Sequence, residues 1–118
     1  MRLKRLKGRD RIRALFAHGK TVHAAPLLLR YQLNKSVEGV FWGISVPKKK
    51  FNRAVDRNRI KRQLWALAYH HRQKLMSLFP DREMVGMLVF LDTKHHNYQD
   101  LERFFLALLD QWEKAIED

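Results

Sequence analysis

The chain has 118 residues, 46% of them hydrophobic, which is enough for a single domain over residues 1–118 with a core of its own. It carries 24 Lys and Arg against 12 Asp and Glu and has no cysteine, so a disulfide framework and a thiolate metal site are excluded. The formal net charge of +12 favours an anionic partner. The apolar runs are short and there is no signal-peptide pattern, so we expect that partner to be a nucleic acid in the cytoplasm and not a membrane.

The N-terminal half predicts one short helix followed by strands. Apolar residues recur at helical spacing over Arg9–His18, and Gly19 is placed to end that helix. The apolar positions are Ile12, Leu15 and Phe16. Thr21–Leu33 and Val40–Val46 are rich in β-branched and aliphatic residues, with turn residues over Asn34–Gly39 between them. We therefore expect two or three antiparallel strands in this half.

The C-terminal half predicts a long helix, a strand and a last helix. One apolar stripe runs from Arg53 to about Leu78, with Pro80 just beyond its end. Its members are Ile60, Leu64, Leu67, His71 and Leu75. Met84–Leu91 is almost continuously apolar and suits a strand covered on both faces. Asn97 and Asp100 can cap the last helix. The apolar face of that helix is formed by Leu101, Phe105, Leu108 and Trp112. This order of elements predicts an α+β sandwich with helices packed on a small sheet.

Positive charge is most concentrated between Lys48 and Arg62, called the basic segment below. Its cations are Lys48, Lys49, Lys50, Arg53, Arg57, Arg59, Lys61 and Arg62, and its single acid is Asp56. A solvated helix face usually mixes both signs, whereas like charges at this density repel one another and gain by releasing counterions from a polyanion. The segment also spans the junction of a strand with the start of the long helix, where free N–H groups attract phosphate. Nucleic-acid binding is therefore preferred to the alternative of a solubilising surface.

Two motifs lie in and beside the basic segment. They are Gly43–Lys49, which reads Gly-Ile-Ser-Val-Pro-Lys-Lys, and Arg57–Arg62, which reads Arg-Asn-Arg-Ile-Lys-Arg. At this spacing they resemble the protein subunit of bacterial ribonuclease P. The resemblance extends to the basic stretch Lys4–Leu6, to Phe16–Lys20 at the end of the first helix and to the aliphatic strand Leu27–Leu33. It therefore covers most of the chain.

The resemblance implies an αβββαβα fold, similar to the second domain of small-subunit ribosomal protein five, with a left-handed β-α-β crossover. It also implies the function of an accessory subunit in an endoribonuclease that removes the 5′ leader from precursor tRNA. In that family the large RNA subunit and its bound Mg²⁺ carry out the catalysis, so no catalytic or metal-binding residue is expected on this chain. The expected partners are the ribonuclease P RNA and precursor tRNA, with one protein monomer for each RNA.

The resemblance assigns two sets of binding residues by position. Those expected to contact the catalytic RNA are Lys48, Lys49, Arg53, Arg57, Asn58, Arg59, Lys61 and Arg62. Those expected in the cleft for the single-stranded leader are Phe16, Lys20 and Tyr31. The sequence departs from the family pattern at Trp65 and Ala66, where a cation and an acid are common, and at Ile12, where an aromatic is common. The aromatic residue of the first long strand aligns either with Tyr31 or with Arg30.

The histidines predict no metal site. His70 and His71 are adjacent on the expected helix and so about 100° apart, which should prevent them from chelating one ion together. His95 and His96 are expected to be solvated loop residues, near Asp92 in a turn. Two other functions stay open, a structural RNA-binding protein such as one on the ribosome, and a protein-only nuclease. A nuclease of that kind would need gathered carboxylates, whereas the acids here are scattered along the sequence.

Overall fold

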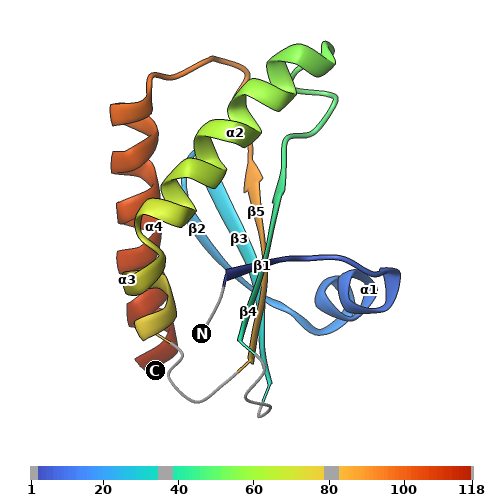
Figure 1. Ribbon diagram of the computed structural model, residues 1–118, viewed down its shortest axis with the longest axis vertical. Coiled ribbons are helices and arrows are strands. Elements are labelled where there is room, and N and C mark those ends of the chain that lie inside the picture. Colours follow the sequence, from blue (N-terminus) through green and yellow to red (C-terminus); the bar gives the residue numbers. More distant parts are fainter. Residues whose placement is uncertain (1–2, 35–38, 79–82, 118) are drawn as a thin grey trace.

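The computed structural model describes residues 3–34, 39–78 and 83–117, and in it a five-stranded sheet is covered by helices on both faces (Figure 1). The elements in chain order are β1 (Leu3–Arg5), α1 (Arg9–His18), β2 (Lys20–Ala24), β3 (Leu27–Asn34), β4 (Val40–Ser45), α2 (Ala54–His70), α3 (Arg72–Ser77), β5 (Glu83–Phe90) and α4 (Tyr98–Glu117). Helices α2, α3 and α4 lie on one face and α1 on the other. Residues 35–38 of the turn expected over Asn34–Gly39, and the residue Pro80, lie outside the described residues. None of the described helices is long and apolar enough to cross a bilayer.

The sheet has the strand order β1-β4-β5-β3-β2. Strand β3 pairs antiparallel with both β2 and β5, whereas β4 pairs parallel with both β1 and β5. The predicted antiparallel pairing is confirmed for β2 and β3. It is wrong for β4, because β5 lies between β3 and β4. The sequence did not predict β1, since the three residues Leu3–Arg5 are too few to show an alternating pattern.

The parallel strands β4 and β5 are joined by a crossover through α2 and α3. In Figure 1 the chain rises along β4, descends through the two helices on the left and rises again along β5, which lies behind β4. This path is left-handed, as the resemblance implied, and it is the hand that such connections rarely take. The crossover leads from the carboxyl end of β4 directly into α2. The basic segment therefore lies at that end of the sheet.

Two apolar cores hold the layers together. The larger lies between the sheet and the helices α2 and α4. Within it the ring of Trp42 lies 6.4 Å from that of Phe105 and 6.2 Å from that of Trp112, measured between centroids. The smaller core lies under α1 and is formed by Leu15, Phe41 and Val85. Because both faces of the central strands are covered, these strands are apolar at most positions.

The two predicted C-terminal helices are present, but the first is broken at His71. Helix α2 ends one residue earlier, His71 has φ −102° and ψ 23°, and α3 begins one residue later. The His71 imidazole bonds the carboxylate of Glu102 on α4 at 2.9 Å, which fixes the break against the neighbouring helix. In α4, Asn97 accepts the N–H of Asp100 at 2.8 Å, so the predicted cap is confirmed. The stripe residues that are buried, as predicted, are Ile60, Leu64, Leu67, Leu75, Leu101, Phe105, Leu108 and Trp112.

Gly19 ends α1 because of a close approach and not because of its backbone angles. Its N–H donates to the Leu15 carbonyl at 2.8 Å, and its φ of −72° is one that any residue can adopt. A Cβ at this position would lie 2.3 Å from the Leu15 carbonyl oxygen and 3.1 Å from that of Tyr31. Glycine is therefore required here by space, at the point where α1 passes into β2.

Replacing Gly19 with Ala should destabilise the protein. At a site that accepts a methyl group this change stabilises a protein by about 0.4–1 kcal/mol, because it restricts the unfolded chain. Here the methyl group must displace backbone, so we expect the free energy of unfolding to fall by about 1–3 kcal/mol. Urea unfolding of Gly19→Ala beside the wild type measures the difference, and a variant as stable as the wild type would contradict the steric account.

Candidate nucleic-acid interface

The basic segment begins in a loop that one aromatic side chain anchors. The N–H of Phe51 donates to the Pro47 carbonyl at 3.3 Å, which closes a turn. Phe51 is only 7% exposed, and its ring centroid lies 4.9 Å from that of His95 in the loop between β5 and α4. Burial of this ring holds the loop against the body of the protein. The residues left exposed at the turn are Lys48 and Lys49.

Arg57, one of the predicted RNA contacts, is turned back into this loop. Its Nη1 donates to the carbonyl oxygens of Phe51 and Asn52, both at 2.8 Å. Hydrogen bonds from a charged donor are among the stronger ones, so they fix the path of the chain into α2. Arg57 is therefore a positioning residue. Its charge still adds to the local positive potential, because carbonyl groups do not neutralise it.

Asp56, the single acid of the basic segment, neutralises only part of the charge around it. Its two carboxylate oxygens lie 3.5 Å from Nε of Arg53 and 3.4 Å from Nε2 of His95. Helix α2 begins at Ala54 without a side-chain cap, so its free N–H groups add positive potential at the same place. The remaining cations of the segment that are exposed are Lys48, Lys49, Arg59 and Arg62.

A cation that sequence reasoning missed joins this surface from β1. The guanidinium carbon of Arg5 lies 4.5 Å from the centroid of the Trp65 ring on α2. Parallel pairing of β1 with β4 places Arg5 opposite Trp42, on the edge of the sheet that α2 covers. Trp65 stands where the resemblance expects a cation, so Arg5 brings a positive charge to the place where the helix itself lacks one. No local pattern signals this contact, because it joins two distant parts of the chain.

The outer side of α2 carries a shallow cavity of about 670 Å³. Its lining residues are Arg5, Val55, Asn58, Lys61, Arg62 and Trp65. The structure therefore gathers three of the predicted RNA contacts, Asn58, Lys61 and Arg62, around the stacked Arg5 and Trp65 pair. Cations gathered in this way can bind backbone phosphates.

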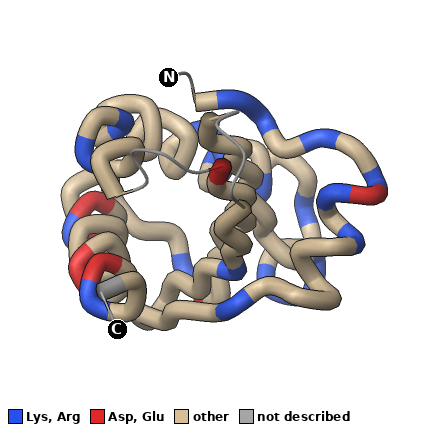
Figure 2. Tube along the Cα trace, turned by 90° about the horizontal axis from the view of Figure 1, so that it is seen from below, with Lys and Arg blue, Asp and Glu red and all other residues tan. Residues whose placement is uncertain are grey.

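The acids of the chain lie mainly away from this surface. Figure 2 shows Asp and Glu gathered along α4, while Lys and Arg are spread over the rest of the trace. Five of the chain's 12 acids fall within α4. Because α4 packs beside α2, these acids bound the positive surface on that side. The charge of the basic segment and of Arg5 is thus left largely uncompensated on the outer side of α2, the loop before it and β1.

The three predicted leader residues do not share one surface. Phe16 is 53% exposed on α1, whereas Tyr31 is 5% exposed on the opposite face of the sheet, with its ring centroid 5.3 Å from that of Trp112. Burial raises the pKa of the Tyr31 hydroxyl. Lys20 is the register partner of Tyr31, and the two line a cavity of about 380 Å³ near the end of α4. Tyr31 is therefore not available to stack on a base beside Phe16.

Strand alternation instead places Arg30 on the face where α1 lies. Its Nε donates to the Leu15 carbonyl at 3.1 Å, and its guanidinium carbon lies 5.6 Å from the centroid of the Phe16 ring. On the same face the guanidinium carbon of Arg11 lies 3.8 Å from the centroid of Phe41. Of the two residues that could align with the family aromatic, Arg30 is the one beside α1. This face therefore offers an exposed aromatic ring next to ordered cations.

The two loop histidines make specific contacts, and of the two His95 is exposed, as expected, whereas His96 is half-buried. The Asp92 carboxylate bonds Nε2 of His96 at 2.7 Å and accepts the N–H groups of the next two residues at 2.7 and 3.3 Å. The bond to His96 is the main cause that lowers the pKa of Asp92. His95 contacts Phe51 and Asp56, as described above. The loop between β5 and α4 thus supports the start of α2, with Asp92 in the turn role predicted for it.

Comparisons with known proteins agree with the motifs in the sequence. The family model described as Ribonuclease P matches residues 1–113. The ribonuclease P protein component of Nitrosococcus oceani is 34% identical over 113 residues, which is 93% of this chain and 91% of that protein. The component from Porphyromonas gingivalis is 32% identical over 89 residues, which is 74% of this chain and 65% of that protein's length.

A solved structure confirms the predicted fold class. The ribonuclease P protein of Staphylococcus aureus superposes on this chain with a TM-score of 0.72 at 21% sequence identity. The match covers 90% of this chain and 92% of that one. At this level of identity the likeness concerns the fold, which includes the helix layer and the sheet that position the basic segment.

The bond between Asp92 and His96 should make the free energy of unfolding depend on pH in the acidic range. The pKa of Asp92 is lower in the folded protein than its ordinary value of 3.8. Asp92 therefore contributes fully to the free energy of unfolding above pH 3.8, and this contribution is lost as the pH falls through the pKa of the folded state. Asp92→Asn should therefore reduce the free energy of unfolding by about 1 kcal/mol near neutral pH. The difference in free energy of unfolding between Asp92→Asn and the wild type should shrink below about pH 4. Urea unfolding across this range measures the difference, and a difference that stays constant in acid would contradict the assignment.

Proposed function

The chain belongs to the ribonuclease P protein family, and we propose that it is the protein component of a bacterial ribonuclease P that removes the 5′ leader from precursor tRNA. In this proposal the outer side of α2 and the loop before it bind the ribonuclease P RNA. The leader lies along the face of the sheet that α1 partly covers. One protein monomer binds one RNA in the cytoplasm, and the assembly acts as an endoribonuclease.

The observation that carries the proposal is the exposed and uncompensated charge of the basic segment. Its one acid, Asp56, is already shared by Arg53 and His95, and Arg57 is held by carbonyl groups. Binding of the other cations to a polyanion releases the polyanion's counterions, and this release is a favourable contribution to the binding free energy. The proposed contacts to the RNA are Lys48, Lys49, Arg53, Asn58, Arg59, Lys61 and Arg62, with Arg5 added from β1 and Arg57 positioning the loop.

Mg²⁺ does not fit the basic segment as a protein-bound ion. It prefers carboxylate, carbonyl or phosphate oxygens, and Asp56 is the only acid between Lys48 and Arg62. In the proposal the RNA phosphates hold the Mg²⁺, which supplies the activation of water for phosphodiester hydrolysis. The side chains of this protein reduce repulsion between the two RNA molecules and position the leader. No catalytic group on the chain is required for that role.

The proposed leader site rests on Phe16 and its neighbours. Phe16 is the most exposed large aromatic on the face of the sheet where α1 lies, and Arg30 is ordered beside it by hydrogen bonds to α1. Stacking on an aromatic ring and attraction to cations suit a single strand of any sequence. Lys20, exposed at the start of β2, can add a phosphate contact at the edge of the sheet. Tyr31 takes no part, since it is enclosed under α4.

Removing exposed cations of α2 should weaken RNA binding through charge alone. Arg59→Ala and Arg62→Ala should each reduce the log-log salt slope of binding to the ribonuclease P RNA by about one unit, and Arg5→Ala should act in the same direction. Lys114→Ala, on the distant end of α4, is the matched control and should leave the slope unchanged. Titrations at several salt concentrations measure the slopes. Equal slopes for all four variants would remove these arginines from the interface.

Reconstitution with the cognate RNA tests the function itself. The protein should lower the Mg²⁺ requirement of cleavage and bind precursor tRNA more tightly than mature tRNA when assembled with the RNA. Phe16→Ala should reduce that preference for precursor by the equivalent of about 1–3 kcal/mol and leave the affinity for mature tRNA unchanged. Gln111→Ala, an exposed change on α4 and so on the other side of the sheet, serves as the control.

Each alternative function predicts a different result in the same assay. A structural RNA-binding protein would bind without preferring a 5′ extension. A protein-only nuclease would cleave precursor tRNA in the absence of the RNA subunit. Either result would overturn the proposed function.

A further inference from the structure

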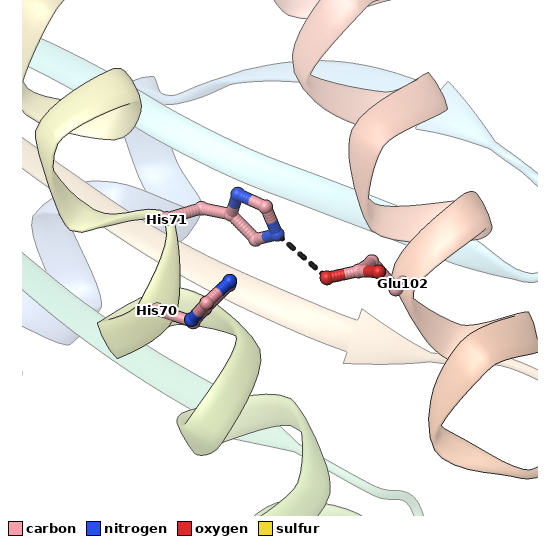
Figure 3. Close-up of side chains that lie close together, drawn as sticks. All are labelled: His70, His71 and Glu102. Atoms are coloured by element: carbon pink, nitrogen blue, oxygen red, sulfur yellow. Dashed lines mark hydrogen bonds and ion pairs between the residues drawn. The ribbon is translucent and has the colours of Figure 1, made fainter.

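A group of metal-ligating side chains lies where α2 meets α3, facing α4. It is formed by His70, His71 and Glu102, whose ligand atoms all lie within 4.8 Å of one another. Figure 3 shows both imidazole rings and the carboxylate around one gap between the helices. Within residues 3–34, 39–78 and 83–117 it is the one group of three or more His, Asp or Glu so arranged. The proposed RNA-binding function makes no use of it.

The break between α2 and α3 brings the two adjacent histidines together. On a continuous helix their side chains would diverge by about 100°. At His71 the backbone leaves the helical region, with φ at −102°, and the ring centroids of His70 and His71 lie 4.8 Å apart. The prediction that these residues cannot share one ion is therefore not supported by their geometry. Glu102, on the facing side of α4, supplies a carboxylate oxygen 2.9 Å from Nε2 of His71.

We propose that His70, His71 and Glu102 form a binding site for Zn²⁺ that ties the α2–α3 junction to α4. Imidazole nitrogen and carboxylate oxygen are ligands that Zn²⁺ prefers, and three of them leave a fourth tetrahedral position for water. This site is separate from the RNA-bound Mg²⁺ of the proposed function. Two imidazoles favour Zn²⁺ over Mg²⁺, which prefers oxygen ligands.

Small movements are enough to close the site around an ion. Ligand atoms bound to tetrahedral Zn²⁺ at about 2.0–2.2 Å lie roughly 3.3 Å from one another. The pair formed by His71 and Glu102 is already at 2.9 Å and has to open slightly, with the ion taking the place of the proton between them. The His70 side chain is exposed, so its ring can turn toward the pair without disturbing the core. No rearrangement of the helices is required.

The surroundings of the site also favour an ion. The nearest cation along the chain, Arg72, is engaged elsewhere, since its Nη1 donates to the Tyr69 carbonyl at 2.9 Å and its guanidinium carbon lies 4.3 Å from the Tyr69 ring. On the inner side, the ring centroid of Phe105 lies 6.1 Å from that of His71. One side of the site is thus apolar, which strengthens the attraction between an ion and Glu102.

Zinc binding by the purified full-length chain, without RNA, tests the proposal. Isothermal titration with Zn²⁺ should show one saturable site per chain, and Zn²⁺ should raise the melting temperature. Co²⁺, used as a spectroscopic probe, should give the intense visible absorption of a tetrahedral site. His70→Gln and Glu102→Gln should weaken Zn²⁺ binding at least tenfold. His23→Gln, which removes an exposed histidine outside the site, should bind as the wild type does.

The variants are chosen so that a folding defect cannot be mistaken for loss of the site. His70 is exposed, and the amide of Glu102→Gln can still bond His71, so both variants should melt near the wild type in the absence of metal. Absence of saturable Zn²⁺ binding to the wild type would overturn the proposal. Binding that is unchanged in His70→Gln and Glu102→Gln would do the same, because the ion would then sit elsewhere. Because RNA is not present, these outcomes are independent of the proposed function.

Discussion

The position of the positive charge depends on the burial of one apolar stripe of α2. Ile60, Leu64 and Leu67 are enclosed in the main core, and truncating any one of them to Ala would cost about 2–5 kcal/mol. The helix cannot rotate about its axis without exposing this stripe, so Arg59 and Arg62 are fixed on the outer side. Parallel pairing of β4 with β5 adds a second restriction, because the chain can reach β5 only by returning through the helices. Apolar packing thereby places the cations together although they repel one another.

Cations in this protein are ordered by carbonyl groups and aromatic rings more than by acids. Arg57 donates to two loop carbonyls, and Arg5 and Arg11 lie over the rings of Trp65 and Phe41. The same arrangement recurs where Lys4 lies over Phe41, Arg30 over Phe16 and Arg72 over Tyr69. A carboxylate cancels the charge that it orders, whereas a carbonyl or a ring orders a side chain and leaves its charge intact. Such partners suit a surface that has to present charge to a polyanion.

Local patterns in the sequence predicted the elements, and long-range pairing decided what those patterns left open. The stripes of α2 and α4 repeat with the helical period, so their buried faces and the charged outer side of α2 could be found from the sequence. The run Leu27–Leu29 is apolar at successive positions, and alternation alone does not say which face is the core. Pairing with β2 and packing under α4 decide this. Tyr31 faces the main core under α4, and Arg30 faces the side of the sheet where α1 lies. The stacking of Arg5 on Trp65 was missed for the same reason, since it depends on the pairing of β1 with β4.

The helix break at His71 shows where an argument from periodicity holds and where it fails. The N–H of His71 still donates to the Leu67 carbonyl at 3.0 Å, and Leu75 beyond the break is buried in the same core. The chain therefore keeps its buried stripe through a change of direction, because packing enforces that stripe. Nothing enforces the exposed side in the same way. The non-helical φ of His71 and the bond from its ring to Glu102 accompany the approach of the two neighbouring imidazoles. Periodicity predicts which residues pack, and the contacts between side chains outside the core depend on local backbone geometry that the pattern does not encode.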